Sequence, residues 1–137
     1  MIKYQVINTK ISGNFEPRVE WIKKVINQYG FTVGDIIYVF CDDDYLIEIN
    51  RKFLNHDTYT DIITFPESNN KKIISGQILI SIPRVIENAK ERGLNFEDEF
   101  DRVLIHGVLH LMGYEDHTEL EKQEMRLQED ISLSLRH

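Results

Sequence analysis

Two histidines four residues apart, His106 and His110, stand in an apolar segment towards the C-terminal end of the chain. If that segment is helical, both imidazoles project from one face, one turn apart. Gly113 can end such a helix in the left-handed conformation, so that the chain turns back and brings His117 to the same point. Three imidazoles around one point suit zinc and leave a coordination position open for water or substrate. The segment therefore predicts a catalytic zinc centre on a helix.

The residue that follows His106 limits which reaction a zinc centre at this position can catalyse. Helical zinc proteases carry a glutamate at that position as general base, whereas this chain has Gly107. A zinc hydrolase is therefore favoured over a peptidase. The simpler alternative is that His106 and His110 are partly buried histidines on an amphipathic helix. The glycine break and the third histidine favour the metal centre over that alternative.

The same segment resembles the signature of a known family. Its run HGVLHLMGY (residues 106–114), followed by acidic residues and a histidine, is similar to the bacterial YbeY family of zinc-dependent endoribonucleases that mature ribosomal RNA. A second similarity lies upstream, in NRKF (residues 50–53) and DTYTDIITFP (residues 57–66). The resemblance implies a single-strand-specific endoribonuclease that acts in small-subunit (16S) rRNA maturation and ribosome quality control. It also implies one Zn²⁺ per chain, RNA as substrate, and the small ribosomal subunit or a ribosomal protein as partner.

The third ligand is the point at which this chain departs from the family's spacing. The family has five residues between the second and third histidines, whereas this chain has six, residues 111–116. Asp116 occupies the expected position and His117 follows it. Since carboxylate oxygen also binds zinc, either residue can be the ligand. We favour His117, because the turn after Gly113 can absorb one extra residue more easily than a site can change its ligand type.

A second departure concerns an arginine that the family has directly after the aromatic residue of its upstream motif. A cation there would stabilise phosphate charge in the transition state, but this chain has Leu54 after Phe53. Either Arg51 or Lys52 substitutes from the preceding turn, or activity is reduced. Two other functions therefore stay open: a ribosome-associated binding protein with a structural zinc, and a zinc hydrolase acting on a different substrate.

The upstream motif also supplies candidates for the walls of the metal cleft. The resemblance implies that His56, Asp57 and Asp61 lie near it; the structural alternative is a turn held by hydrogen bonds through Asn55 and Asp57. With His106, His110 and His117 holding zinc, the hypothesis is that the metal polarises the scissile phosphate and lowers the pKa of a water. Asp116, Glu115 and His56 are the candidates for proton transfer.

Composition and net charge limit the number of domains, the cellular location and the partners that we expect. The chain has 137 residues, of which 42% are hydrophobic and 28% charged, and we expect one domain over residues 1–137. The single cysteine, Cys41, cannot form an internal disulfide, and no apolar run suggests a membrane span or signal peptide, so we expect a cytoplasmic protein. A net charge of −7 argues against strong, nonspecific binding to nucleic acid, and DNA is not expected as a partner. Basic residues must cluster locally, or the metal or a partner must attract the RNA.

Periodicity predicts an α+β fold with a small mixed sheet of about four strands, covered by helices, with the metal-binding helix central. Strands are expected at residues 4–7, 36–40, 60–66 and 73–82, the last interrupted at 75–76, and helices at 17–29, 45–54, 83–92 and from about 96 to 112. The three adjacent aspartates Asp42, Asp43 and Asp44 are expected to cap the second helix in preference to binding a metal, and Thr118 with Glu121 forms a capping box for a last helix. That helix carries Leu120, Leu127 and Ile131, which we expect to pack onto the core, and Trp21 is expected in the core or at its rim.

Overall fold

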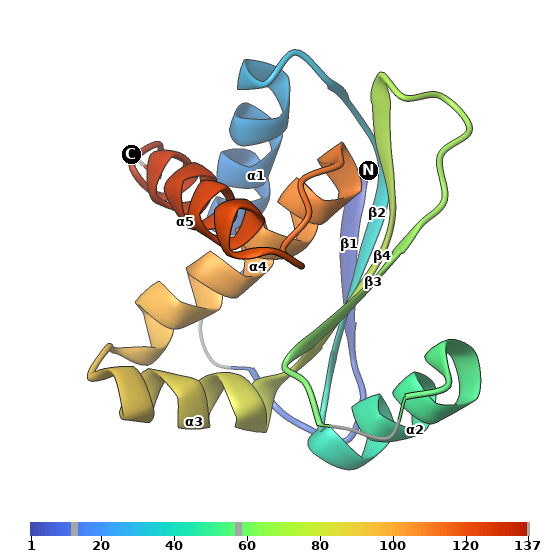
Figure 1. Cartoon of the computed structure of the whole chain (residues 1–137), viewed down its shortest axis with the longest axis vertical. Helices are drawn as coiled ribbons and strands as arrows, with labels where there is room; N and C mark the ends of the chain where they lie inside the picture. Colours follow the sequence, from blue (N-terminus) through green and yellow to red (C-terminus); the bar gives the residue numbers. More distant parts are fainter. Residues whose placement is uncertain (12–13, 57–58, 137) are drawn as a thin grey trace.

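The computed structural model describes residues 1–11, 14–56 and 59–136. It contains, in chain order, β1 (Ile2–Val6), α1 (Glu16–Gln28), β2 (Thr32–Cys41), α2 (Asp43–Leu54), β3 (Ile62–Pro66), β4 (Ile73–Ser81), α3 (Ile82–Arg92), α4 (Phe96–Met112) and α5 (Glu119–Leu133). The strands form one sheet in the order β1-β2-β4-β3, in which β1, β2 and β4 are parallel and β3 is antiparallel to β4. This architecture (Figure 1) confirms the predicted α+β fold and its mixed sheet of four strands.

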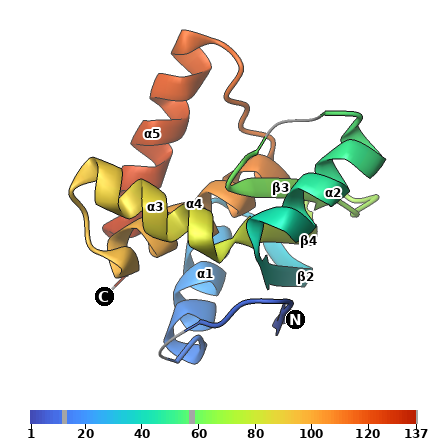
Figure 2. The ribbon, with the colours of Figure 1, turned by 90° about the horizontal axis from the view of Figure 1, so that it is seen from below.

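Both faces of the sheet are covered, by different helices. The larger core joins one face to α1, α4 and parts of α3 and α5. A smaller cluster on the other face packs Leu46 of α2 against Val39 and Leu79. Figure 2 shows this division, with α2 apart from the group of helices that includes α1 and α4. The interruption expected at residues 75–76 is a register shift between β2 and β4, and β4 itself is continuous.

Side-chain caps fix where the helices begin. The predicted capping of α2 by the aspartate run is confirmed, and the capping residue is Asp42, whose carboxylate accepts a hydrogen bond of 2.9 Å from the backbone N–H of Tyr45. Thr118 and Glu121 form the predicted capping box of α5. Asn95 caps α4 in the same way, through the N–H of Asp98. No helix in the described part of the chain is long and apolar enough to cross a membrane.

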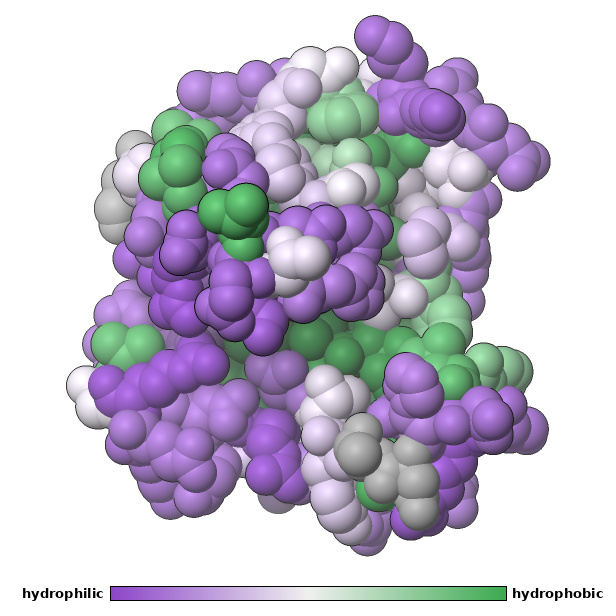
Figure 3. All heavy atoms as spheres, viewed as in Figure 1, coloured by the Kyte–Doolittle hydropathy of each residue, from purple (hydrophilic) through white to green (hydrophobic). Residues whose placement is uncertain are grey.

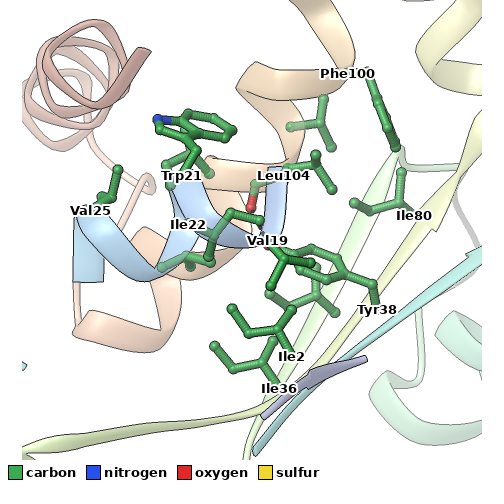
Figure 4. Packing of buried hydrophobic residues seen from close by; sticks show 14 of the residues in the cluster. Ile2, Val19, Trp21, Ile22, Val25, Ile36, Tyr38, Ile80, Phe100 and Leu104 are labelled. Carbon is green, nitrogen blue, oxygen red and sulfur yellow. Dashed lines mark hydrogen bonds between the residues drawn. The ribbon is translucent and has the colours of Figure 1, made fainter. Parts of the chain in front are cut away.

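The core that supports α4 lies between this helix, α1 and the sheet. Figure 4 shows Tyr38 of β2 directed towards Leu104, and the Tyr38 hydroxyl donates a hydrogen bond of 2.9 Å to the Leu104 carbonyl. Trp21 is buried, as predicted, and its indole N–H donates to the Ser132 carbonyl at 2.9 Å. These bonds satisfy polar groups that would otherwise be buried without partners. They tie α4 and the C-terminal segment to the rest of the core.

Gly107 lies where α4 approaches the sheet closely. A Cβ atom at this position would lie 2.7 Å from Cγ2 of Ile78 and 3.1 Å from Cδ1 of Ile62. Carbon atoms in contact are normally about 3.5–4.0 Å apart. Only a residue without a side chain therefore allows α4 to approach β4 and β3 this closely. That approach brings the neighbouring His106 beside the edge of the sheet.

The prediction that Leu120, Leu127 and Ile131 pack onto the core is wrong. Their side chains are exposed by 78%, 51% and 43%. The buried face of α5 instead contains Met125, Glu129 and Ser132. The reason is that α5 turns a partly polar face to α4, where Glu129 has charged and imidazole partners. Apolar periodicity alone therefore selected the wrong side of this helix.

Candidate metal centre

The last turns of α4 place His106 and His110 next to each other, as their spacing predicts. Their Nε2 atoms are 3.0 Å apart. Oδ2 of Asp116, from the loop after α4, lies 3.4 Å from Nε2 of His106 and 3.3 Å from Nε2 of His110. Among the described residues, these three form the cluster whose donor atoms are grouped closely enough to hold a metal ion, all within 4.8 Å of one another.

The path of the loop explains how Asp116 reaches the histidines. Gly113 ends α4 with a φ of 109°, in the left-handed region that favours glycine, and the N–H of Tyr114 then donates to the Leu109 carbonyl at 3.0 Å. At the other end of the loop, the Glu121 carboxylate accepts hydrogen bonds from the backbone N–H groups of His117 and Thr118. The loop is therefore anchored at both ends, with Asp116 between the two anchors.

His117 lies elsewhere. Its side chain is 78% exposed, and its Nε2 is 3.1 Å from the carboxylate of Glu115. The structure thus brings Asp116 to the histidine pair and leaves His117 outside the cluster, with Glu115 beside it.

A buried carboxylate from α5 orients His106. Oε2 of Glu129 is 2.6 Å from Nδ1 of His106, while Oε1 accepts a hydrogen bond of 2.8 Å from Arg102. With Nδ1 as the donor, the lone pair of Nε2 is directed at the cluster. Burial alone lowers the pKa of His106, but the hydrogen bond and negative charge of Glu129 outweigh it and raise that pKa overall. Burial raises the pKa of Glu129, and its bonds to His106 and Arg102 bring that pKa below its usual range.

The cluster opens into a polar cavity of about 430 Å³. The cavity is lined by residues of β3 and the segment before it, of α3, α4 and α5, and of the loop that carries Asp116: Thr60, Asp61, Ile62, Thr64, Arg92, Glu99, Arg102, Val103, His106, His110, Asp116, Arg126 and Glu129. Figure 3 shows this face of the molecule hollowed below the hydrophilic surface of α5, with hydrophobic residues at the back of the hollow. The cavity provides space for a substrate directly beside the candidate ligands.

The upstream motif contributes to this cavity only in part. Asp61 lines it and accepts a hydrogen bond of 3.3 Å from the Asn88 side chain. His56 does not join the cluster, and lines a neighbouring cavity together with Leu54. Thr60, Ile62 and Thr64 line both cavities, so the two adjoin each other. Asp57 lies outside the described residues.

The sequence pattern did not indicate five charged residues of the cavity wall: Arg92, Glu99, Arg102, Arg126 and Glu129. Glu129 and Arg126 stand in an acidic and basic stretch of α5 whose local pattern resembles any solvated helix face. Glu99 lies in the first turn of α4, where acidic residues are common at the surface, yet its side chain is fully buried and pairs with Arg92 at 2.8 Å. No local signal distinguishes these residues, because their roles depend on contacts between separate helices.

A mixed sheet packed against a central helix, with a His–His–Asp cluster beside a polar cavity, defines a class of protein: the α+β proteins with a candidate hydrolytic metal centre. The chain belongs to the family described as Endoribonuclease YbeY, which matches residues 4–135. This membership confirms the family and the enzyme class predicted from the sequence, a hydrolase that cleaves RNA phosphodiester bonds.

Individual relatives agree with this assignment. The chain is 49% identical to the Endoribonuclease YbeY of Cytophaga hutchinsonii over 116 residues, covering 85% of this chain and 81% of the relative. It is 43% identical to that of Porphyromonas gingivalis over 133 residues, covering 93% and 87%. It also resembles the solution structure of TM1509 from Thermotoga maritima, with a TM-score of 0.69 and 26% identity over 99% of this chain and 89% of the other.

Proposed function

We propose that this chain is a zinc-dependent endoribonuclease that cleaves single-stranded RNA in the maturation of small-subunit ribosomal RNA. One observation carries the proposal: in a member of an endoribonuclease family, two imidazole nitrogens and a carboxylate oxygen converge beside a cavity. Maturation of ribosomal RNA implies work in the cytoplasm, on the small ribosomal subunit or with one of its proteins. A role in ribosome quality control belongs to the same proposal.

The donor set suits zinc. Ligand atoms of a tetrahedral zinc ion, with bonds of about 2.0–2.1 Å, lie about 3.3 Å from each other. The three donor atoms here are separated by 3.0, 3.3 and 3.4 Å. Two histidines and one carboxylate form a ligand set found in catalytic zinc sites, which keep a fourth position open. One zinc ion per chain is the cofactor that we propose.

Asp116 is our candidate for the third ligand. The sequence favoured His117, but the distances to Asp116 and the orientation of His117 towards Glu115 support the carboxylate. The hydrogen-bonded ends of the loop would have to move to exchange the two side chains. In this proposal the third ligand stays at the family's position in the sequence, and its type changes from histidine to aspartate.

Bound at this site, zinc would supply Lewis acidity towards a phosphate oxygen and would lower the pKa of a water molecule. The protein's own contribution begins with Glu129, which holds the Nδ1 proton of His106 and fixes the ring. Arg102 holds Glu129 in turn. Asp61 faces the cavity and is our candidate for proton transfer, since Asp116 is occupied as a ligand. His56, in the adjoining cavity, would contact a flanking part of the substrate.

The test is cleavage of a short single-stranded RNA by the purified chain, beside an identically prepared His110→Ala variant that reports contaminating nucleases. We expect the wild type to cleave the RNA and to contain about one zinc per chain by elemental analysis, and the variant to lack both properties. A wild-type protein that retains zinc but does not cleave RNA would contradict the proposal. It would point instead to a structural zinc in a ribosome-associated binding protein.

A further inference from the structure

The candidate active site contains several cationic side chains, although the chain as a whole carries a net charge of −7. Among the described residues, the lysines and arginines that line the cavity are Arg92, Arg102 and Arg126. Neither Arg51 nor Lys52, the two substitutes considered for the family's arginine, is one of them. The positive groups near the metal centre thus come from α3, α4 and α5.

Two of these arginines are committed to carboxylates of the protein. Arg92 donates two hydrogen bonds to Glu99, at 2.8 and 3.1 Å. Arg102 pairs with Glu129 at 2.8 Å and with Asp130 at 2.7 Å. Since Glu99 and Glu129 are buried, the charges of both guanidinium groups are largely neutralised within the fold. They hold the wall of the cavity together, and little of their charge is left for a ligand.

Arg126 differs from both. It is an exposed residue of α5, three positions before Glu129 and therefore on the same side of that helix. Within the described ranges, no hydrogen bond or ion pair involves its side chain, although it lines the cavity. Its five N–H donors and its charge are thus available to a ligand in the cavity. Folding gains little from such an exposed, unpaired cation.

Carboxylates of the cavity wall repel a phosphate group, and Arg126 can offset that repulsion. The charges of Glu99 and Glu129 are balanced by Arg92 and Arg102, but Asp61 and Asp116 also line the cavity, so a phosphodiester that enters it meets their carboxylates. A guanidinium group at the wall offsets this repulsion at short range and can hold two phosphate oxygens at once. We propose that Arg126 binds a backbone phosphate of the RNA in this cavity and so positions the strand for cleavage. The inference rests on the proposed function. In it, a cation from α5 takes the place of the arginine that the family has where this chain has Leu54.

Binding and cleavage test the inference separately. For binding, the zinc-loaded chain is titrated with a short 2′-O-methyl RNA, checked to be intact afterwards, at several salt concentrations. The binding constant K falls as salt rises, and for a single-stranded nucleic acid each phosphate contact adds about 0.7 to the steepness of log K against log salt. Arg126→Gln is expected to weaken binding about tenfold and to lower that slope by about 0.7. Arg126→Lys is expected to restore the slope but only part of the affinity, since a lysine lacks the two-pronged geometry.

The matched control is Lys24→Gln, which removes the same charge from an exposed position of α1 that does not line the cavity. It should leave affinity and slope unchanged. In cleavage of an unmodified single-stranded RNA, kcat/KM of Arg126→Gln should fall about tenfold or more, with zinc content unaltered.

The outcomes are distinct. Equal affinity and slope for wild type and Arg126→Gln would overturn the inference, as would equal losses in Lys24→Gln. Loss of zinc or of helical circular dichroism in Arg126→Gln would also overturn it, because Arg126 would then be structural. If binding depends on Arg126 but the wild type cleaves no RNA, the inference stands and the nuclease function fails.

Discussion

The Nδ1 atom of His106 lies 2.6 Å from Oε2 of Glu129, a contact that couples α4, which carries the candidate ligands, to α5. Arg102 holds the other oxygen of the same carboxylate at 2.8 Å. Because Glu129 is buried, this arrangement limits the rotation of the imidazole ring and directs Nε2 towards the cluster. The geometry of the candidate metal centre therefore depends on a helix that supplies none of its ligands.

We expect Glu129→Gln to lower zinc affinity about 10- to 100-fold, because an amide is a weaker acceptor than a carboxylate for the Nδ1 proton of His106. Competition with a zinc-binding dye measures this affinity. Glu124→Gln is the control, since Glu124 is exposed on the same helix. Equal zinc affinity in the wild type and Glu129→Gln would show that this carboxylate does not support the site.

The identity of the third ligand can be decided by a pair of adjacent variants. Asp116→Ala should lose zinc and cleavage activity, because it removes an oxygen 3.3–3.4 Å from both histidine nitrogens. His117→Ala should retain both, since its side chain lies outside the cluster. Elemental analysis and RNA cleavage are measured on each variant. The opposite result, with zinc lost only in His117→Ala, would restore the histidine as ligand.

Gly107→Ala should destabilise the protein by about 1–3 kcal/mol, because the added methyl overlaps the Ile78 side chain and α4 must move away from the sheet. Urea unfolding followed by circular dichroism gives the free energy of unfolding. In an Ile78→Ala background, which removes the overlapping atoms, the same substitution should cost less. An identical cost in both backgrounds would refute the close contact as the cause.

Glu99 makes stability depend on pH. Burial raises the pKa of this carboxyl above its ordinary value, and the nearby Arg92 only partly opposes it. The folded state therefore binds the proton more tightly than the unfolded state, and its stability falls as pH rises from about 4.3 through the folded pKa. The stability of the wild type relative to Glu99→Gln should thus be lower at neutral pH than at about pH 5.

Urea unfolding of both proteins at the two pH values measures that difference. Glu48→Gln, at an exposed position of α2, is the control and should show no such change. A free energy of unfolding of the wild type that rises with pH relative to that of Glu99→Gln, or stays constant, would contradict the prediction.

Local features of the sequence determined much of this protein. The spacing of His106 and His110 placed both imidazoles on one face of a helix, because that relation depends only on the 3.6-residue period. Capping by the aspartate run and by Thr118 could be predicted for the same reason, since the backbone groups that Asp42 and Thr118 bond lie three residues ahead. Alternating and helical periodicity likewise gave the strands and helices of the α+β fold.

What only the tertiary structure decided involves residues far apart in the chain. Glu129 reaches His106 across 23 positions, and Gly107 is explained by Ile78 of another element. Which side of α5 is buried depends on its polar partners on α4, so the exposed Leu127 was misassigned from periodicity. The placement of Asp116 depends on a turn anchored at both ends. Sequence periodicity reports local backbone geometry, whereas the residues that orient the candidate ligands are placed by how separate helices pack.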